Sequence, residues 1–296
     1  MRYSKKNISR ICFGCEALGG EDWGRFDLSE LQEGIEKSID LGLNFFDTAD
    51  VYGLGLSEKR LSEILGPRRH DFIIGTKGGI EWKKTSISRA DTKKNSSPEY
   101  IKDCVDKSLK RLRVDILPIY YIHWPDPSTK ISKTFEALQG LIDKEKIRYL
   151  GCSNFNLDQI RQAKEVADIS FIQMPVNILN SPLPHSFSEF CKTNSIKIVA
   201  YNTLASGLLS GKYHTDSIFP KNDRRSRLES FQKTNLEKFS QEVGRLKLKA
   251  DKENLTISQY SIREALRNQN IESVIVGIKN EQQAIENISW IENQDK

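Results

Sequence analysis

A regular alternation of short apolar runs with longer amphipathic segments constrains the fold more than any other feature of this chain. The apolar runs are predicted strands over Arg10–Gly14, Asn44–Asp47, Phe72–Thr76, Ile116–Ile122, Tyr149–Ser153, Phe171–Pro175, Lys197–Tyr201 and Ser273–Gly277. Helical spacing between them covers Leu28–Leu41, Ser57–Leu65, Pro98–Arg111, Ile131–Lys144, Leu157–Ala167, Pro184–Asn194, Leu236–Glu253 and Glu281–Ile288. Strict alternation favours parallel strands with right-handed crossovers. Eight such units predict an α/β fold, a closed (β/α)8 TIM barrel, with a doubly wound sheet as the alternative.

Three local features refine this prediction. A further helical pattern over Thr256–Arg267 has no strand of its own, so we expect an added helix outside the barrel or at its mouth. Pro118 deletes a hydrogen-bond donor from the fourth strand, which predicts either a later strand start or a bulge. Ser97 and Asn156 stand where side chains commonly cap a helix start.

Length and composition limit the classes of protein. Barrels of this type commonly occupy ~250 residues as one domain, so we expect a single domain over residues 1–296. The net charge of +5 is spread along the chain, whereas nucleic-acid binding needs a clustered basic face. No apolar run approaches the ~18 residues of a membrane span, and no signal peptide is visible. We therefore expect a cytoplasmic protein that binds neither nucleic acid nor membrane.

The cysteines and histidines favour neither disulfides nor a metal. The five cysteines are interpreted as buried thiols, and the C-x-x-C spacing of Cys12 and Cys15 falls on a strand, where the two side chains point to opposite faces. The four histidines lie in separate segments without metal-ligand spacing. No metal site is predicted.

Four polar residues follow three successive predicted strands. Asp47 and Tyr52 come after the second strand, Lys77 after the third and His123 after the fourth. The carboxyl ends of barrel strands converge on one mouth, where active sites lie. Taken singly, each residue has an ordinary structural interpretation as a turn cap, a half-buried aromatic, a solvated lysine or a loop histidine. Their joint placement indicates an enzyme.

These residue types suit the reduction of a carbonyl group. The developing alkoxide needs a proton, and Tyr52 is the expected general acid. A free phenol with a pKa near 10 donates reluctantly, but the ammonium of Lys77 favours its ionised form. Asp47 can orient Lys77, and a neutral His123 can orient the carbonyl oxygen.

Several longer motifs carry a family resemblance. They are Phe46–Gly53 with Gly55, Ser57 and Glu58, then Ser108–Leu112, His123–Pro127, Lys146–Phe155, Tyr201–Lys212 and the closing Glu286 and Asn287. In this order, from about Ile11 to Asn287, the chain resembles the aldo-keto reductases. The resemblance implies a (β/α)8 barrel that reduces carbonyls with NADPH and without metal. It also implies a catalytic tetrad of Asp47, Tyr52, Lys77 and His123.

The resemblance further implies a cofactor site. The residues expected to contact the cofactor are Ser153, Asn154, Gln173, Tyr201, Leu204, Ser206, Leu208, Ser210, Lys212, Gly277, Lys279, Gln283, Glu286 and Asn287. Among these, Lys279 is expected to meet the 2′-phosphate of NADPH. Gln283 stands where many family members have Arg, so NADPH is favoured over NADH with less support. No G-x-G-x-x-G motif follows a strand, so a Rossmann site is not predicted.

The expected function is the reduction of an aldehyde or ketone to an alcohol, with a small-molecule carbonyl as the substrate. Two alternatives remain: the reverse oxidation of a sugar or alcohol, and a cofactor-binding regulatory subunit with slow turnover. Trp23 and Trp124 are expected to line the substrate pocket. Two segments, residues 79–97 and 214–232, follow predicted strands at the mouth and could gate it.

Overall fold

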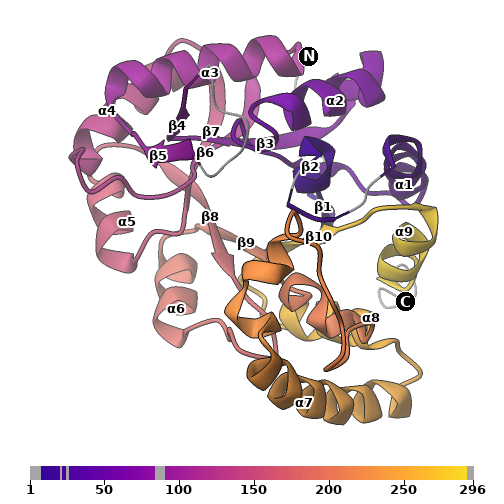
Figure 1. The fold of residues 1–296 in the computed structure, drawn as a ribbon. Coiled ribbons are helices and arrows are strands. Elements are labelled where there is room, and N and C mark those ends of the chain that lie inside the picture. Colours follow the sequence, from indigo (N-terminus) through magenta and orange to yellow (C-terminus); the bar gives the residue numbers. More distant parts are fainter. Residues whose placement is uncertain (1–7, 21, 25–26, 84–90, 292–296) are drawn as a thin grey trace.

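Eight parallel strands form a closed barrel in the computed structural model, which describes residues 8–20, 22–24, 27–83 and 91–291 (Figure 1). The strand order is β1-β10-β9-β8-β7-β6-β3-β2, and β1 pairs with both β2 and β10. The barrel strands are β1 (Ile11–Gly14), β2 (Phe45–Asp47), β3 (Ile73–Gly78), β6 (Leu117–Ile122), β7 (Ile147–Ser153), β8 (Ile169–Pro175), β9 (Lys197–Tyr201) and β10 (Ile271–Gly277). The predicted barrel is confirmed, and the doubly wound sheet is wrong.

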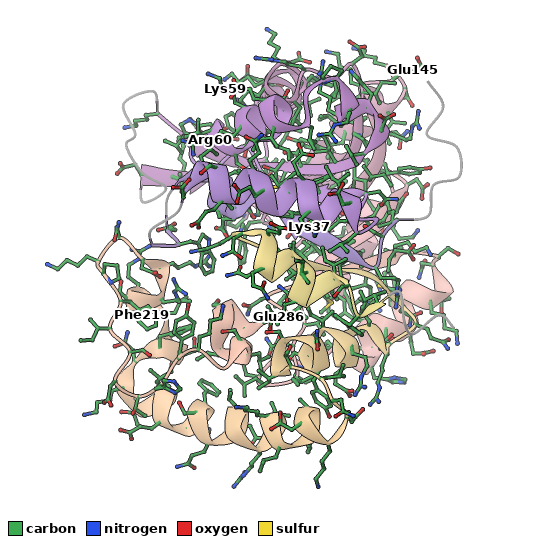
Figure 2. All side chains as sticks on the ribbon, turned by 90° about the vertical axis from the view of Figure 1, so that its right-hand side faces the viewer. Lys37, Lys59, Arg60, Glu145, Phe219 and Glu286 are labelled. Atoms are coloured by element: carbon green, nitrogen blue, oxygen red, sulfur yellow. The ribbon has the colours of Figure 1, made fainter. Side chains whose placement is uncertain are left out.

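Helices surround the barrel, as Figure 1 shows. They are α1 (Leu28–Asp40), α2 (Leu56–Leu65), α3 (Pro98–Leu112), α4 (Ile131–Ile142), α5 (Leu157–Lys164), α6 (His185–Thr193), α7 (Lys233–Lys252), α8 (Ile257–Leu266) and α9 (Glu281–Ile288). In Figure 2 Lys37 lies on α1, close to α9, and its ammonium is 3.3 Å from the Glu281 carboxylate. The first and last helices of the barrel therefore lie side by side. None of the described helices is long and apolar enough to cross a membrane.

The barrel strands are buried on both faces, as expected for a parallel sheet covered by helices. In β6 the side chains alternate: Ile119 and Tyr121 point into the barrel, whereas Tyr120 and Ile122 pack in the layer between strands and helices. The Tyr121 ring lies so close to Gly151 that a Cβ atom there would be 2.3 Å from it. Glycine is therefore required at position 151 of β7, because any larger residue would overlap the Tyr121 ring.

The two helices before β10 exchange the roles that we predicted. The pattern over Leu236–Glu253 predicts one of the eight helices that pack on the barrel strands. In the structure, α7 instead packs on α8 and on the short helices η4 (Ala205–Ser210) and η6 (Glu229–Phe231). The added helix is therefore α7, and α8 is the one that packs on β10. Both segments have an amphipathic pattern, so their sequence alone does not distinguish which one faces the strands.

Two local predictions are wrong. Pro118 lies inside β6 with no register shift between β6 and β7. Leu117 donates its N–H to Lys146 on the β7 side, so position 118 faces β3, where pairing begins only at Ile119. Ser97 is the N-cap residue of α3, but its side chain makes no capping hydrogen bond. The Asn156 cap of α5 is confirmed, with a reciprocal bond from Gln159.

The segment 79–97 holds an unpredicted hairpin. Strands β4 (Ile80–Trp82) and β5 (Thr92–Lys94) pair in an antiparallel manner beside the mouth, while residues 84–90 of this candidate gate lie outside the described residues. Strand β3 also continues two residues past its predicted end. Lys77 consequently lies within β3 and has its backbone fixed by strand pairing.

Candidate active site

The centre of the barrel mouth holds a buried ion pair. Asp47 ends β2, Lys77 lies on the neighbouring β3, and the Lys77 ammonium is 2.6 Å from Asp47 Oδ2 and 2.9 Å from the carbonyl oxygen of Thr48. Both side chains are at most 4% exposed. Burial opposes the charge on Lys77, but the Asp47 carboxylate and the neighbouring Tyr52 outweigh burial and raise the pKa of Lys77 above its ordinary value. The charged form of the lysine is therefore favoured at this buried position.

Tyr52 and His123 lie next to this pair. The Lys77 nitrogen is 5.3 Å from the centre of the Tyr52 ring, and the Tyr52 and His123 ring centres are 5.8 Å apart in an edge-to-face arrangement. A Cβ atom at Gly53 would be 2.2 Å from the Gly19 carbonyl oxygen, so glycine is required for this close approach of the loops. The structure thus brings all four predicted tetrad residues together.

The residues expected to bind the nicotinamide end of the cofactor make hydrogen bonds with one another and with the tetrad. Gln173 donates to Asp47 Oδ1 at 2.6 Å, and Tyr201 donates to Asn154 Oδ1 at 2.6 Å. The Asn154 amide in turn donates to the His123 carbonyl at 2.9 Å and to Ser153 Oγ at 3.1 Å. These four residues lie directly around the tetrad, and their contacts with a cofactor stay a prediction.

The segment expected to bind the pyrophosphate is the turn around η4. Its backbone bends sharply, with positive φ at Ser206 and Gly207. Ser206 donates its N–H to the Asn202 side chain, and Ser210 donates its hydroxyl to the Gly207 carbonyl. Leu208 is buried in the core beneath α7 and α8, so only its backbone can serve a ligand. The other predicted positions of this segment are Leu204, half-buried, and Lys212, exposed.

An open cavity of about 570 Å³ joins η4 to the segment expected to bind adenosine. Ser210 and Gly211 line one side of it, Glu286 of α9 lines another, and Lys247 of α7 also contributes. Glu286 is labelled in Figure 2. Asn287 is 4% exposed, and its Oδ1 atom accepts no hydrogen bond from the described residues. Two segments that are remote in sequence therefore share one cavity.

The predicted gate 214–232 reaches across the mouth to the loop after β1. The backbone of Asp22 accepts a hydrogen bond from Arg224 at 2.7 Å, and the Arg227 guanidinium pairs with the Asp22 carboxylate. The Arg225 guanidinium lies over the Trp23 ring, with its Cζ atom 5.9 Å from the ring centre. We name residues 22–24 with 213–231 the strap. The sequence predicted the segment 214–232 as a candidate gate but not its contact with Asp22, which lies about two hundred positions earlier.

Lys279 is tied to the strap. Its ammonium donates to the Trp23 carbonyl at 2.6 Å, and its backbone N–H donates to Gln283 Oε1 at 3.0 Å. Burial, followed by the nearby Arg225, lowers the pKa of Lys279. Gly277, which ends β10, is exposed just before this turn. Lys279 is half-buried, and an anion beside its ammonium would favour the charged form.

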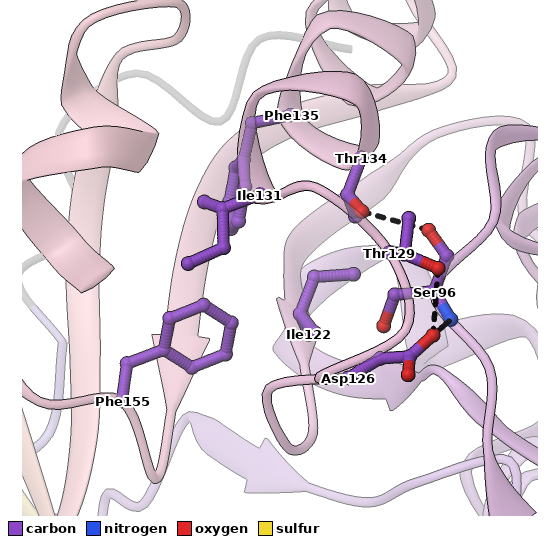
Figure 3. Close-up of a pocket in the computed structure, with 8 residues that line it drawn as sticks. All are labelled: Ser96, Ile122, Asp126, Thr129, Ile131, Thr134, Phe135 and Phe155. Atoms are coloured by element: carbon purple, nitrogen blue, oxygen red, sulfur yellow. Dashed lines mark hydrogen bonds between the residues drawn. The ribbon is translucent and has the colours of Figure 1, made fainter.

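The loop after β6 is held by Asp126, as Figure 3 shows. This carboxylate is 7% exposed and accepts hydrogen bonds from the Ser96 backbone and from Ser128 and Thr129. Thr134 then donates to the Ser96 carbonyl, which joins this loop to the chain before α3. The residues surround a cavity of only about 10 Å³, too small for a substrate. Trp124 lies in the same loop, and its side chain is 40% exposed. The Lys94 ammonium lies over the Trp124 ring.

Asp126 is expected to stabilise the protein in a pH-dependent manner. Burial opposes the charge on this carboxyl, but its hydrogen bonds outweigh burial and lower the pKa to about 2, against an ordinary value of 3.8. The depressed pKa means that this stabilisation is present above pH 4 and is lost as the pH falls toward 2. Asp126→Ala should therefore lower the free energy of unfolding by about 2 kcal/mol at pH 7 and by less at pH 3, measured by urea denaturation.

Asp158→Ala is the matched control, because Asp158 is an exposed carboxylate on α5 that pairs with Arg161. It should change the free energy of unfolding by less than about 1 kcal/mol at either pH. A pH-independent loss in Asp126→Ala would show that packing, and not the charge, explains its effect.

The cysteines and the potential metal ligands of the described residues form no second site. All five cysteines are buried and free, as predicted, and burial raises the pKa of Cys12 and Cys15 well above their ordinary value. Within the described residues, no group of three or more histidine, cysteine and acidic side chains could hold a metal ion.

Comparison with known proteins places this geometry in a family. The model of the aldo/keto reductase family matches residues 10–295. The chain is 34% identical to aldo-keto reductase YhdN of Bacillus subtilis, over 80% of this chain and 71% of that one. The solved glycerol dehydrogenase of Gluconobacter oxydans superposes with a TM-score of 0.84 at 31% identity, covering 95% of this chain and 86% of that chain. This protein belongs to the aldo-keto reductase family.

Two further relatives carry different cofactors in their names. Aldo-keto reductase yakc [NADP(+)] of Schizosaccharomyces pombe is 30% identical, over 86% of this chain and 75% of that one. The NADH-specific methylglyoxal reductase of Escherichia coli is 29% identical, over 95% of this chain and 89% of that one. The chain is thus an oxidoreductase of a family that uses nicotinamide cofactors.

Proposed function

We propose that this protein reduces an aldehyde or ketone to an alcohol with NADPH, and that Tyr52 is the general acid. One observation carries the proposal: the buried ammonium of Lys77, paired with Asp47, lies 5.3 Å from the centre of the Tyr52 ring, beside His123, at the mouth of the barrel. A cation in a dry site stabilises a developing phenolate far more than it would in water.

The mechanism assigns one task to each residue. The nicotinamide cofactor, when bound, supplies the hydride that the carbonyl carbon accepts. Tyr52 gives its hydroxyl proton to the oxygen of the same carbonyl group, which becomes the alcohol. Lys77 stabilises the phenolate that remains, and Asp47 keeps the Lys77 ammonium in place. His123 holds the carbonyl oxygen near Tyr52 by a hydrogen bond.

The residues around the mouth fit a dinucleotide. Ser153, Asn154, Gln173 and Tyr201 would hold its nicotinamide end. The turn around η4, with Leu204, Ser206, Leu208, Ser210 and Lys212, would hold the pyrophosphate. The cavity beside Glu286 and the unsatisfied oxygen of Asn287 suit the adenosine, since a buried acceptor without a donor costs free energy until a ligand supplies one.

The preference for NADPH over NADH rests on Lys279, a cation for the 2′-phosphate. The name of the Schizosaccharomyces pombe relative supports NADPH, and that of the Escherichia coli relative supports NADH. Gln283 supplies no charge, and its side chain accepts from the Lys279 backbone. Lys279 therefore carries the preference in this proposal.

Lys279→Met is expected to weaken NADPH binding about ten-fold or more, because a charge-assisted hydrogen bond to phosphate is worth roughly 1.5–3 kcal/mol. NADH binding should change little. The dissociation constants of both cofactors, measured by fluorescence titration, check this expectation. Equal weakening of both would instead show that Lys279 acts by tying down Trp23.

The test of the function is a screen of NADPH and NADH consumption with sugar, aromatic and aliphatic carbonyls. Steady turnover of at least one carbonyl is expected. The likeness to a glycerol dehydrogenase favours a second candidate, the oxidation of an alcohol on the same site, which a parallel screen with NADP+ and polyols would reveal. Cofactor binding without turnover in either direction would contradict both and favour a regulatory role. The cytoplasmic location stays a prediction.

A further inference from the structure

Behind the turn that carries Tyr52 lies a second buried ion pair, which the proposed mechanism does not use. Glu58 lies in the first turn of α2 and is 0% exposed, and its Oε2 atom is 2.5 Å from Arg111 Nε on α3. The Arg68 and Glu36 pair on the outer helix faces is far more exposed. Glu58 and Arg111 are therefore placed where water does not reach the carboxylate.

Glu58 is also bonded to the strand that carries Lys77. The hydroxyl of Thr76 donates to Glu58 Oε1 at 2.6 Å. Thr76 and Lys77 are adjacent on β3, so their side chains point to opposite faces of the barrel wall. Glu58 thus holds β3 from the outside at the same place where Asp47 holds it from the inside.

Arg111 packs directly against the turn that carries Tyr52. A Cβ atom at Gly55 would be 2.9 Å from Arg111 Cδ, and Gly55 has a φ of +96°, a conformation that favours glycine. Gly55 is the N-cap residue of α2 and lies three positions after Tyr52. The guanidinium and the aliphatic part of the Arg111 side chain therefore pack against the end of the turn at Gly55.

The other end of the turn is bonded to β3. The Lys77 carbonyl accepts a hydrogen bond from the Asp50 backbone at 3.1 Å, and the Lys77 ammonium donates to the Thr48 carbonyl. The turn is thus held at its start by Lys77 and at its end by Arg111. The pair of Glu58 and Arg111 links these two supports through Thr76.

We propose that Glu58 and Arg111 are positioning residues, which set the distance between the Tyr52 phenol and the Lys77 ammonium. A buried ion pair contributes little net stability compared with well-packed apolar residues, so stability alone does not account for one here. Misplacement of catalytic groups by about 1 Å can lower a rate roughly 100-fold. This inference rests on the proposed function, because it assigns the pair a role in the same proton transfer.

The experiment compares Glu58→Gln with the double variant Glu58→Gln/Arg111→Met. The single variant should lower kcat for carbonyl reduction by roughly ten-fold or more, with the dissociation constant of NADPH unchanged. Because it removes the carboxylate from the half-buried Arg111 guanidinium, it should also lower the melting temperature. The double variant should regain the melting temperature but not kcat. Recovery of kcat along with stability would overturn the proposal, because it would show a purely structural role.

A second measurement does not depend on turnover. Hydrogen–deuterium exchange of the amides of Asp50, Tyr52 and Leu54, which are bonded within the turn or to β3, should be faster in both variants. The control Glu264→Gln removes a partly buried charge that pairs with Arg263 on α8, and it should leave both kcat and this exchange unchanged. If the native protein reduced no carbonyl, the proposed function would fail, while unchanged exchange in the two variants would separately overturn the positioning role.

Discussion

Tyr52→Phe is expected to lower kcat for carbonyl reduction by about 10²–10⁴-fold, the usual contribution of a general acid. The phenylalanine ring still fills the space beside His123, so the edge-to-face packing and the Gly53 contact with Gly19 are preserved. Only the phenolic hydroxyl, with its transferable proton, is removed. Steady-state kinetics with the best carbonyl of the screen, beside a fluorescence titration of NADPH, measures the two effects separately.

The expected combination is a large loss of kcat with an unchanged dissociation constant for NADPH. Tyr201→Phe is the matched control, since it removes a hydroxyl that donates to Asn154 and not to the reacting carbonyl. Its kcat should fall far less than that of Tyr52→Phe. An undiminished kcat in Tyr52→Phe would remove Tyr52 from the mechanism.

Lys77→Met should cause a loss of kcat of similar size by another route. The phenolate that remains after proton transfer would no longer face an ammonium, so transfer becomes less favourable. In residual activity, the basic limb of the pH profile should move to higher pH, because the removed cation had favoured ionisation of the acid. The pH dependence of kcat in the variant and the native protein checks this shift.

Loss of stability must be separated from loss of catalysis in this variant. Lys77→Met leaves Asp47 buried beside Gln173 alone, and breaking a buried pair can cost about 3–5 kcal/mol. Adding Asp47→Asn removes the uncompensated charge, so the double variant should regain stability and stay inactive. A basic limb that does not move in a partly active Lys77 variant would refute the coupling between Lys77 and Tyr52.

Much of the candidate site could be predicted from the sequence, because the geometry of a parallel barrel determines where the residues at the strand ends lie. Asp47, Lys77 and His123 stand at the ends of successive strands, and parallel strands bring such positions to one mouth. The structure places their side chains around Tyr52. The sequence predicted the segment 214–232 at the mouth but not its contact with the loop after β1, where Asp22 pairs with Arg227, because no local signal connects the two loops.

The alternation of apolar runs favoured a barrel, because each strand and helix carries its own periodicity. The pairing of β1 with both β2 and β10, which only the folded chain shows, excluded the doubly wound sheet. Contacts between distant residues decided the rest. They made α8, and not α7, the helix that packs on β10, since both have an apolar face and only packing selects between them. They also set the bond between Glu58 and Thr76 and the support of the Tyr52 turn by Arg111, which depend on side chains that meet only in the folded chain.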